Sequence, residues 1–112
     1  MGRSVKRGEV RWCAFQSPDK RRPVLILTRN SAIRFLTNIT VAPITTTVRD
    51  IPTEVYLTPA DGLMAECCAS LDNIQTVSKN RLGDLIAVLT PERMAEVDQA
   101  ISFALGIGHF GF

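Results

Sequence analysis

The sequence predicts an α+β, β-rich domain of short, mostly antiparallel strands that ends in one C-terminal helix. Short apolar segments rich in β-branched residues recur as far as Leu89. Clusters of Pro, Gly, Asp and Asn separate these segments, and a helical repeat of apolar residues follows them. A length of 112 residues indicates a single domain, residues 1–112, with 1–5 and 107–112 as flexible ends.

The first two strands are predicted on either side of a turn. Residues 8–15 alternate in polarity, with Val10 and Trp12 on one face. The turn residues 16–20 follow. Residues 23–28 are nearly all apolar, so we expect this second strand to be buried on both faces.

A helical turn and a third strand come next. Residues 29–36 can hold one turn of helix, capped by Asn30 or Ser31. Residues 37–45 are rich in β-branched side chains and predict a strand. Pro43 lies inside it and has no N–H to donate, so it requires an edge position or a bulge.

The rest of the β region is predicted as three more strands. Residues 52–57 and 66–71 form two of them, separated by a loop at 58–62. Residues 74–78 lead into a short turn, and 86–89 form the last strand.

The C-terminal helix has clear signals at both ends. Thr90 is the cap, Pro91 stands at the first helical position, and Glu92 adds an early acid. Gly106 ends the helix. The apolar side chains between them repeat at helical spacing, which is typical of packing against a core.

The net charge is only +2, but the cations concentrate near the start of the chain. A basic front would favour an anionic ligand, whereas a mixed, solvated surface is the simpler interpretation of charge alone. The cations of the first strands are Arg3, Lys6, Arg7, Arg11, Lys20, Arg21 and Arg22.

The three cysteines predict neither a disulfide framework nor a zinc site. Cys67 and Cys68 are adjacent and would point to opposite faces of a strand, and Cys13 stands alone. The single histidine, His109, lies beyond the helix. We therefore expect packing thiols in a reducing cytoplasm, with no metal and no cofactor. The sequence has no apolar run long enough for a membrane span or signal peptide.

Five short motifs then occur in an order that resembles the MazF/PemK family of toxin endoribonucleases from type II toxin–antitoxin pairs. The motifs are residues 6–10, 22–25, 42–45, 51–55 and 72–77. The resemblance runs from about Lys6 to Gly106 and implies a small SH3-like barrel with appended helices. It also implies a homodimer, a cognate MazE-like antitoxin, and metal-independent, sequence-specific cleavage of single-stranded RNA. The RNA could be mRNA, rRNA or tRNA.

The resemblance assigns the chemistry to two residues. Arg22 matches the family's catalytic arginine before Pro-Val-Leu, and Thr45 matches its catalytic threonine. A guanidinium fork suits a phosphate, and a hydroxyl can donate to another phosphate oxygen. Cleavage would start from the ribose 2′-OH and leave 2′,3′-cyclic phosphate and 5′-OH ends. The expected RNA-binding residues are Trp12, Phe15, Lys20, Arg21, Thr46, Asn73 and Gln75.

Departures from the family pattern bear on base preference. The loop from Phe15 to Arg21 is short, and residues 66–67 and 72–75 replace side chains that the family often uses differently. Two alternatives stay open. One is a CcdB-like toxin of the same fold that binds DNA gyrase without nuclease chemistry, and the other is a nonspecific RNA-binding barrel.

Overall fold

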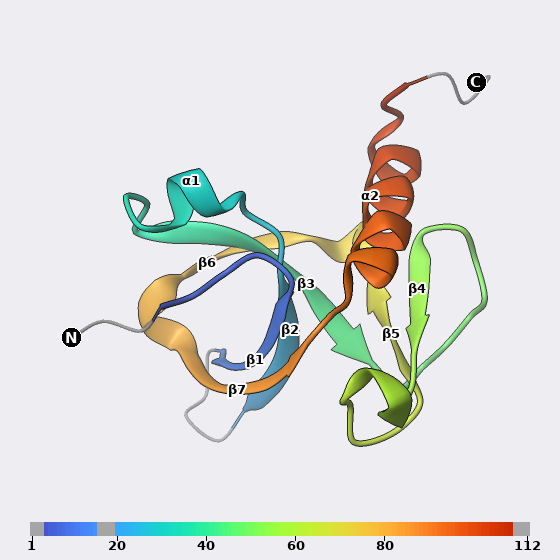
Figure 1. Cartoon of the computed structure of the whole chain (residues 1–112), viewed down its shortest axis with the longest axis horizontal. Helices are drawn as coiled ribbons and strands as arrows, with labels where there is room; N and C mark the ends of the chain where they lie inside the picture. Colours follow the sequence, from blue (N-terminus) through green and yellow to red (C-terminus); the bar gives the residue numbers. More distant parts are fainter. Residues whose placement is uncertain (1–3, 16–19, 109–112) are drawn as a thin grey trace.

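Seven strands form one curled antiparallel sheet, and a long helix packs beside it in the computed structural model (Figure 1). Residues 4–15 and 20–108 are described. The strand order is β4-β5-β3-β2-β1-β7, and β6 pairs with β3 off this path. The architecture confirms the predicted β-rich α+β class and the SH3-like barrel.

The elements are β1 Glu9–Ala14, β2 Arg21–Ile26, α1 Asn30–Ile33, β3 Asn38–Thr45, β4 Glu54–Leu57, β5 Cys67–Ser70, β6 Gln75–Ser78, β7 Leu82–Val88 and α2 Pro91–Leu105, with 3₁₀ turns η1 Pro59–Asp61, η2 Leu71–Asn73 and η3 Lys79–Arg81.

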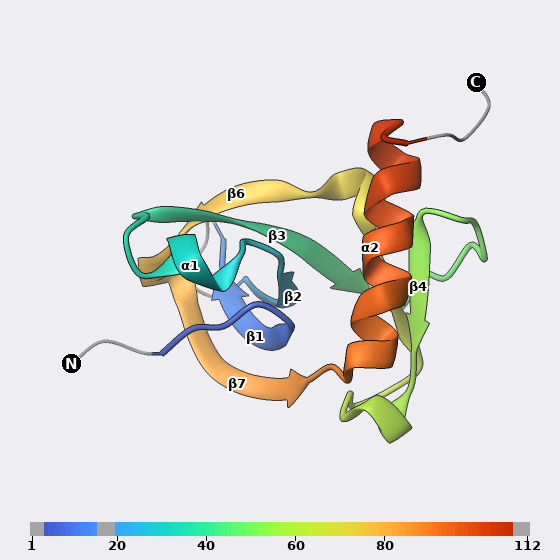
Figure 2. The same ribbon diagram turned by 45° about the horizontal axis from the view of Figure 1, so that its top comes forward.

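The helix α2 lies beside β4 and on the far side of the molecule from α1 (Figures 1 and 2). Its predicted ends are confirmed. The hydroxyl of Thr90 accepts the N–H of Arg93, and Gly106 is left-handed with φ 70°. No helix of the described residues is both long and apolar enough to cross a membrane.

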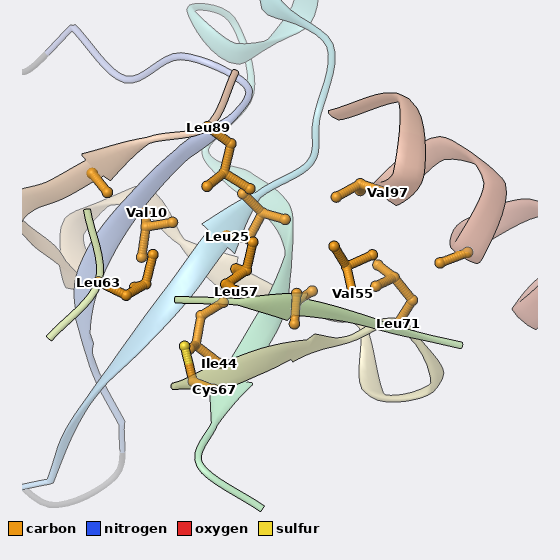
Figure 3. Packing of buried hydrophobic residues seen from close by; sticks show 14 of the residues in the cluster. Val10, Leu25, Ile44, Val55, Leu57, Leu63, Cys67, Leu71, Leu89 and Val97 are labelled. Atoms are coloured by element: carbon orange, nitrogen blue, oxygen red, sulfur yellow. The ribbon is translucent and has the colours of Figure 1, made fainter. Parts of the chain in front are cut away.

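Strand β2 separates two apolar clusters, because its side chains alternate between the faces of the sheet. Leu25 belongs to the first cluster, which lies between the sheet and α2. In Figure 3, Val97 of α2 points toward Val55 and Leu71 in this cluster. Val24 and Ile26 belong to the second cluster, inside the curl of the sheet. The predicted burial of β2 on both faces is therefore confirmed.

Three details correct the sequence predictions. Helix α1 follows Arg29 as its N-cap, with no side-chain cap, because Asn30 Oδ1 instead accepts the N–H of Arg7 at 2.7 Å. Strand β7 begins at Leu82, four residues before the predicted start at Ile86, because pairing with β1 extends along the curl.

The third detail concerns Pro43, which lies in a central strand with no bulge in its pairing to β2. Strand β3 pairs with β6 as far as Val41 and with β5 from Ile44. Pro43 therefore falls between the two partners, where its missing N–H breaks no pairing on that side.

Candidate active site

Arg22 lies near the start of β2, opposite Cys13 of β1. Its side chain is exposed. Within residues 4–15 and 20–108, the guanidinium makes no hydrogen bond or ion pair. No described residue therefore occupies its five N–H donors, and they can bind an anionic ligand.

Thr45 ends β3 and pairs with Cys68 of β5. Its Oγ1 accepts the N–H of Thr47 at 3.1 Å, which fixes the hydroxyl at the turn after the strand. A hydroxyl has one donor hydrogen in addition to its lone pairs. Thr45 can therefore still donate to a ligand oxygen.

The strand register brings these two residues together. The pairing of β2 with β3 ends at Val24 opposite Pro43. The same antiparallel register, continued by two residues, sets Arg22 opposite Thr45. Both residues border one cavity of about 270 Å³.

Arg21 points to the opposite face of β2 from Arg22, although both residues border the same cavity. Alternation along β2 places Arg22 on the face of Val24 and Arg21 on the face of Pro23. Pro23 pairs with Trp12 of β1, and the Arg21 guanidinium stands 5.1 Å from the centre of the Trp12 ring. Trp12 and Arg21 thus hold each other in a cation–π contact on that face.

Of the other predicted RNA-binding residues, Thr46, Phe15 and Gln75 border one of two cavities, whereas Lys20 and Asn73 border neither. Thr46 is exposed and borders the cavity of Arg22. Phe15 and Gln75 border a second cavity of about 380 Å³. Lys20 is exposed at the start of the β2 side of the hairpin, and its carbonyl accepts the N–H of Phe15 at 3.0 Å. Asn73 borders neither cavity; its Nδ2 donates to Ser70 Oγ at 2.8 Å.

One wall of the first cavity is not predicted by the sequence. Leu63, Met64 and Ala65, between η1 and β5, line it, and Met64 is 68% exposed. These residues carry no charge or motif in the sequence, so only the tertiary structure reveals their place. Arg81 is not predicted either; it borders the second cavity and donates to the carbonyl of Phe15 at 3.2 Å.

The wall is anchored to α2. Arg93 Nε donates to Asp61 Oδ1 at 3.0 Å, and Asp61 Oδ2 accepts the N–H of Thr58 at 2.9 Å. The hydrogen bond from Arg93 holds the pKa of the Asp61 carboxyl below its usual value. Gly62 follows with φ 98°, and a Cβ there would lie 2.9 Å from the Cβ of Ala87. A glycine is required at this close approach.

The cysteines lie in the core, and burial raises the pKa of all three thiols. For Cys68 the pKa rises to about 11, mainly through burial and also through the carboxylate of Glu54. These thiols remain protonated near neutral pH, which suits packing. No three His, Cys, Asp or Glu side chains of the described segments lie together as a metal-ligand group.

Two cations of the predicted basic front are neutralised within the fold. Arg7 Nη2 lies 2.6 Å from Asp98 Oδ1 of α2. Arg11 Nε lies 2.7 Å from Glu9 Oε1, with both side chains about nine-tenths buried. The front is therefore less basic than the sequence predicts, and among its described residues the exposed cations Lys6, Lys20, Arg21 and Arg22 remain. Residues 16–19 and His109 lie outside the described residues.

The site lies on a small, curled, SH3-like β-sheet, where an arginine near the start of β2 and a threonine at the end of β3 stand side by side on two central strands. Residues 6–105 match the family described as PemK-like, MazF-like toxin of type II toxin–antitoxin system. The chain belongs to this family. The resemblance seen in the sequence is thereby confirmed.

Three relatives illustrate the similarity. Endoribonuclease MazF3 of Mycobacterium tuberculosis is 47% identical over 88 residues, which cover 79% of this chain and 82% of that protein. The structure of Mycobacterium tuberculosis toxin MazF-mt6 is 40% identical with a TM-score of 0.82, and covers 89% of this chain and 98% of that one. An endoribonuclease in complex with its cognate antitoxin, from a mycobacterial species, is 34% identical with a TM-score of 0.83, over 93% and 97% of the chains.

Two of these relatives are named endoribonucleases, the third is named a MazF toxin, and none is named a gyrase-binding toxin. The CcdB-like alternative is therefore not supported.

Proposed function

We propose that this MazF-like toxin is an endoribonuclease that cleaves single-stranded RNA in a sequence-specific way at the cavity of Arg22 and Thr45. One observation carries the proposal: an exposed guanidinium without a described partner and a hydroxyl with a free donor border the same cavity. The two groups match the needs of a phosphate, which offers several oxygens to hydrogen-bond donors. The family membership supplies the reaction class.

The reaction we assign is transesterification. The ribose 2′-oxygen forms a bond to phosphorus, and the bond from phosphorus to the 5′-oxygen breaks. The 2′-OH loses one proton and the leaving 5′-oxygen gains one, so no cofactor or water is consumed. The products are a 2′,3′-cyclic phosphate and a 5′-OH.

Arg22 and Thr45 act in this step on the phosphate oxygens. Negative charge builds on these oxygens as the fifth bond to phosphorus forms, and fixed donors stabilise it. The Arg22 fork supplies the positive charge, and the Thr45 hydroxyl donates to a second oxygen. We assign charge stabilisation to Arg22 because a guanidinium is a poor proton donor.

We assign the RNA contacts to both cavities. Thr46 borders the cavity of the reaction, while Phe15 and Gln75 offer a ring and an amide in the second cavity. Aromatic rings stack on unpaired bases, and amides read base edges. Trp12 and Arg21 contribute as a stacked pair, Lys20 as a phosphate contact, and Asn73 as a base contact.

We further propose that the toxin acts in the cytoplasm as a homodimer and is neutralised by a cognate MazE-like antitoxin. The antitoxin complex of the mycobacterial endoribonuclease supports the antitoxin part of this proposal, because that chain has almost the same length and fold. The exposed cations Lys20, Arg21 and Arg22 suit an acidic antitoxin segment that folds as it binds.

The decisive experiment uses an RNA oligonucleotide that the toxin cuts. A copy with a single 2′-deoxy sugar just 5′ of the scissile phosphate is expected to resist cleavage at that phosphate, and the unmodified oligonucleotide should still be cut in EDTA. End mapping should find cyclic phosphate and 5′-OH.

Cleavage of the deoxy copy at the same phosphate would overturn the mechanism. Loss of activity in EDTA would overturn metal independence. Affinity for RNA without any cleavage would favour the nonspecific RNA-binding barrel instead.

A further inference from the structure

A row of residues crosses the sheet next to the proposed reaction centre. Cys68 of β5 pairs with Thr45 on one side and with Tyr56 of β4 on the other. Directly opposed residues of antiparallel strands put their side chains on the same face. Tyr56 therefore shares the face of Thr45, two strands away.

The spacing of this row suits a nucleotide next to the scissile phosphate. Neighbouring strands lie about 4.8 Å apart, so two strands set Tyr56 about 10 Å from Thr45. Tyr56 does not belong to the core. Side chains alternate along β4, so Val55 and Leu57 point into the core and Tyr56 lies on the opposite face.

Tyr56 is 44% exposed, and the exposed Glu66, two residues before its partner Cys68, is its diagonal neighbour on the same face of the sheet. Glu66 immediately precedes β5, so the carboxylate stands at the start of the strand that carries Cys68. The interaction with the negative carboxylate of Glu66 raises the pKa of the Tyr56 hydroxyl. The ring of Tyr56 is thus accessible to a ligand, and the carboxylate of Glu66 has lone pairs that can accept a hydrogen bond from it.

We propose that Tyr56 and Glu66 form a base-recognition subsite for a nucleotide flanking the scissile phosphate. The Tyr56 ring stacks on the base, and Glu66 accepts a hydrogen bond from an exocyclic amino group. The subsite rests on the proposed RNA cleavage, and it adds a preference for particular bases next to the scissile phosphate.

The chemistry of the pair selects among bases. Adenine, cytosine and guanine carry amino groups that donate to a carboxylate. Uracil has carbonyl oxygens at the corresponding positions, and these repel a carboxylate. The subsite therefore favours amino-bearing bases over uracil at one position beside the cut.

The experiment maps cleavage of a randomised RNA library by the full-length protein and its variants. Glu66→Gln is expected to weaken discrimination against uracil at one position about tenfold, because an amide also offers donors to a carbonyl. Tyr56→Ala is expected to lower kcat/KM about tenfold through lost stacking. Tyr56→Phe keeps the ring and should retain most of the activity.

Matched controls isolate the effect. Phe35→Ala removes another exposed aromatic ring, at the end of α1, and Asp84→Asn neutralises an exposed acid of β7; both should leave the base preference unchanged. If Tyr56→Ala fails to fold, the base preference of Glu66→Gln still decides the question, because Glu66 is exposed.

The inference and the proposed function fail in different ways. Wild-type cleavage with unchanged base preference in Glu66→Gln and unchanged kcat/KM in Tyr56→Ala would overturn the subsite and leave the cleavage proposal standing. If the wild type cuts no RNA, the proposed function itself is overturned, and the subsite falls with it.

Discussion

Arg22 owes its importance to its surroundings and not to its residue type alone. The fold neutralises Arg7 and Arg11 with carboxylates, and Arg21 lies against Trp12. Arg22 is exposed at the cavity and has no such partner among the described residues. A cation that stabilises no part of the fold is available for a ligand.

We expect Arg22→Ala to lower RNA cleavage by about 100-fold or more with an unchanged melting temperature, because a lost charge-stabilising donor has about this effect on rate. Arg22→Lys should recover little activity, since an ammonium lacks the bidentate fork. Cleavage assays with circular dichroism as the folding check test this. Arg34→Ala, at another exposed arginine, is the control, and wild-type activity in folded Arg22→Ala would contradict the assignment.

Thr45 is distinguished from its neighbours by its position at the strand end. We expect Thr45→Ala to lower kcat about tenfold or more with little change in KM, because the hydroxyl donates mainly as charge develops on phosphate. Thr47→Ala is the matched control, since its N–H contact to Thr45 is made by the backbone. A larger loss of kcat in Thr46→Ala than in Thr45→Ala would show that Thr46, and not Thr45, is the catalytic threonine.

At the scale of elements, the turn η1 and the helix α2 act as one unit around the cavity. Asp61 caps η1 and binds Arg93, and the segment that follows forms the wall of Leu63 and Met64. The Asp61 side chain is only 10% exposed. The wall therefore depends on a contact between two elements far apart in the sequence.

We expect Asp61→Asn to lower the free energy of unfolding by about 1–3 kcal/mol at pH 7, as for a hydrogen bond between charged groups. Because the pKa of Asp61 is lowered in the folded state, its contribution is fully present above the ordinary value of 3.8 and is lost as the pH falls through the folded pKa. The difference between wild type and variant should therefore shrink toward pH 2.

Urea unfolding at pH 7 and at pH 2–3 measures this difference. Glu96→Gln removes the more exposed partner of Arg93, and it should cost less than about 0.5 kcal/mol. Equal losses in the two variants would mean that the Asp61 contact has no special role.

At the scale of the molecule, the described sheet has an unpaired edge at each end of its strand order, at β4 and at β7. Strand β4 is the last in its order and has β5 as its only neighbour in the described sheet. An open edge next to a helix offers backbone donors and acceptors to a partner. This is the kind of surface that a second copy or an antitoxin segment can use.

We expect the purified toxin to be a dimer at micromolar concentration and to lose RNA cleavage when its acidic antitoxin binds. Lys20→Glu should weaken the antitoxin more strongly at low salt than at high salt, because surface charges are screened over about 10 Å at 0.1 M salt. Light scattering gives the mass, and titration of cleavage against antitoxin gives the affinity. A monomeric mass would contradict the proposal. An antitoxin affinity that changes with neither the Lys20→Glu substitution nor the salt concentration would contradict it as well.

The elements whose signals are local could be predicted from the sequence. Thr90, Pro91 and Gly106 predicted α2, and the apolar run of β2 predicted its burial on both faces. These signals depend on neighbours a few residues away, such as a cap or an alternation. The order of the motifs also sufficed for the family and for Arg22 and Thr45 as the candidates for catalysis.

The way in which distant residues combine could not be predicted from the sequence and is visible only in the folded chain. Pro43 lies in a central strand because β3 changes partners there, which depends on the placement of β5 and β6. The cation–π pair of Arg21 and Trp12 and the wall at Met64 likewise come from pairing and packing across many residues. Register and long-range contacts are properties of the folded sheet, and no local pattern in the sequence encodes them.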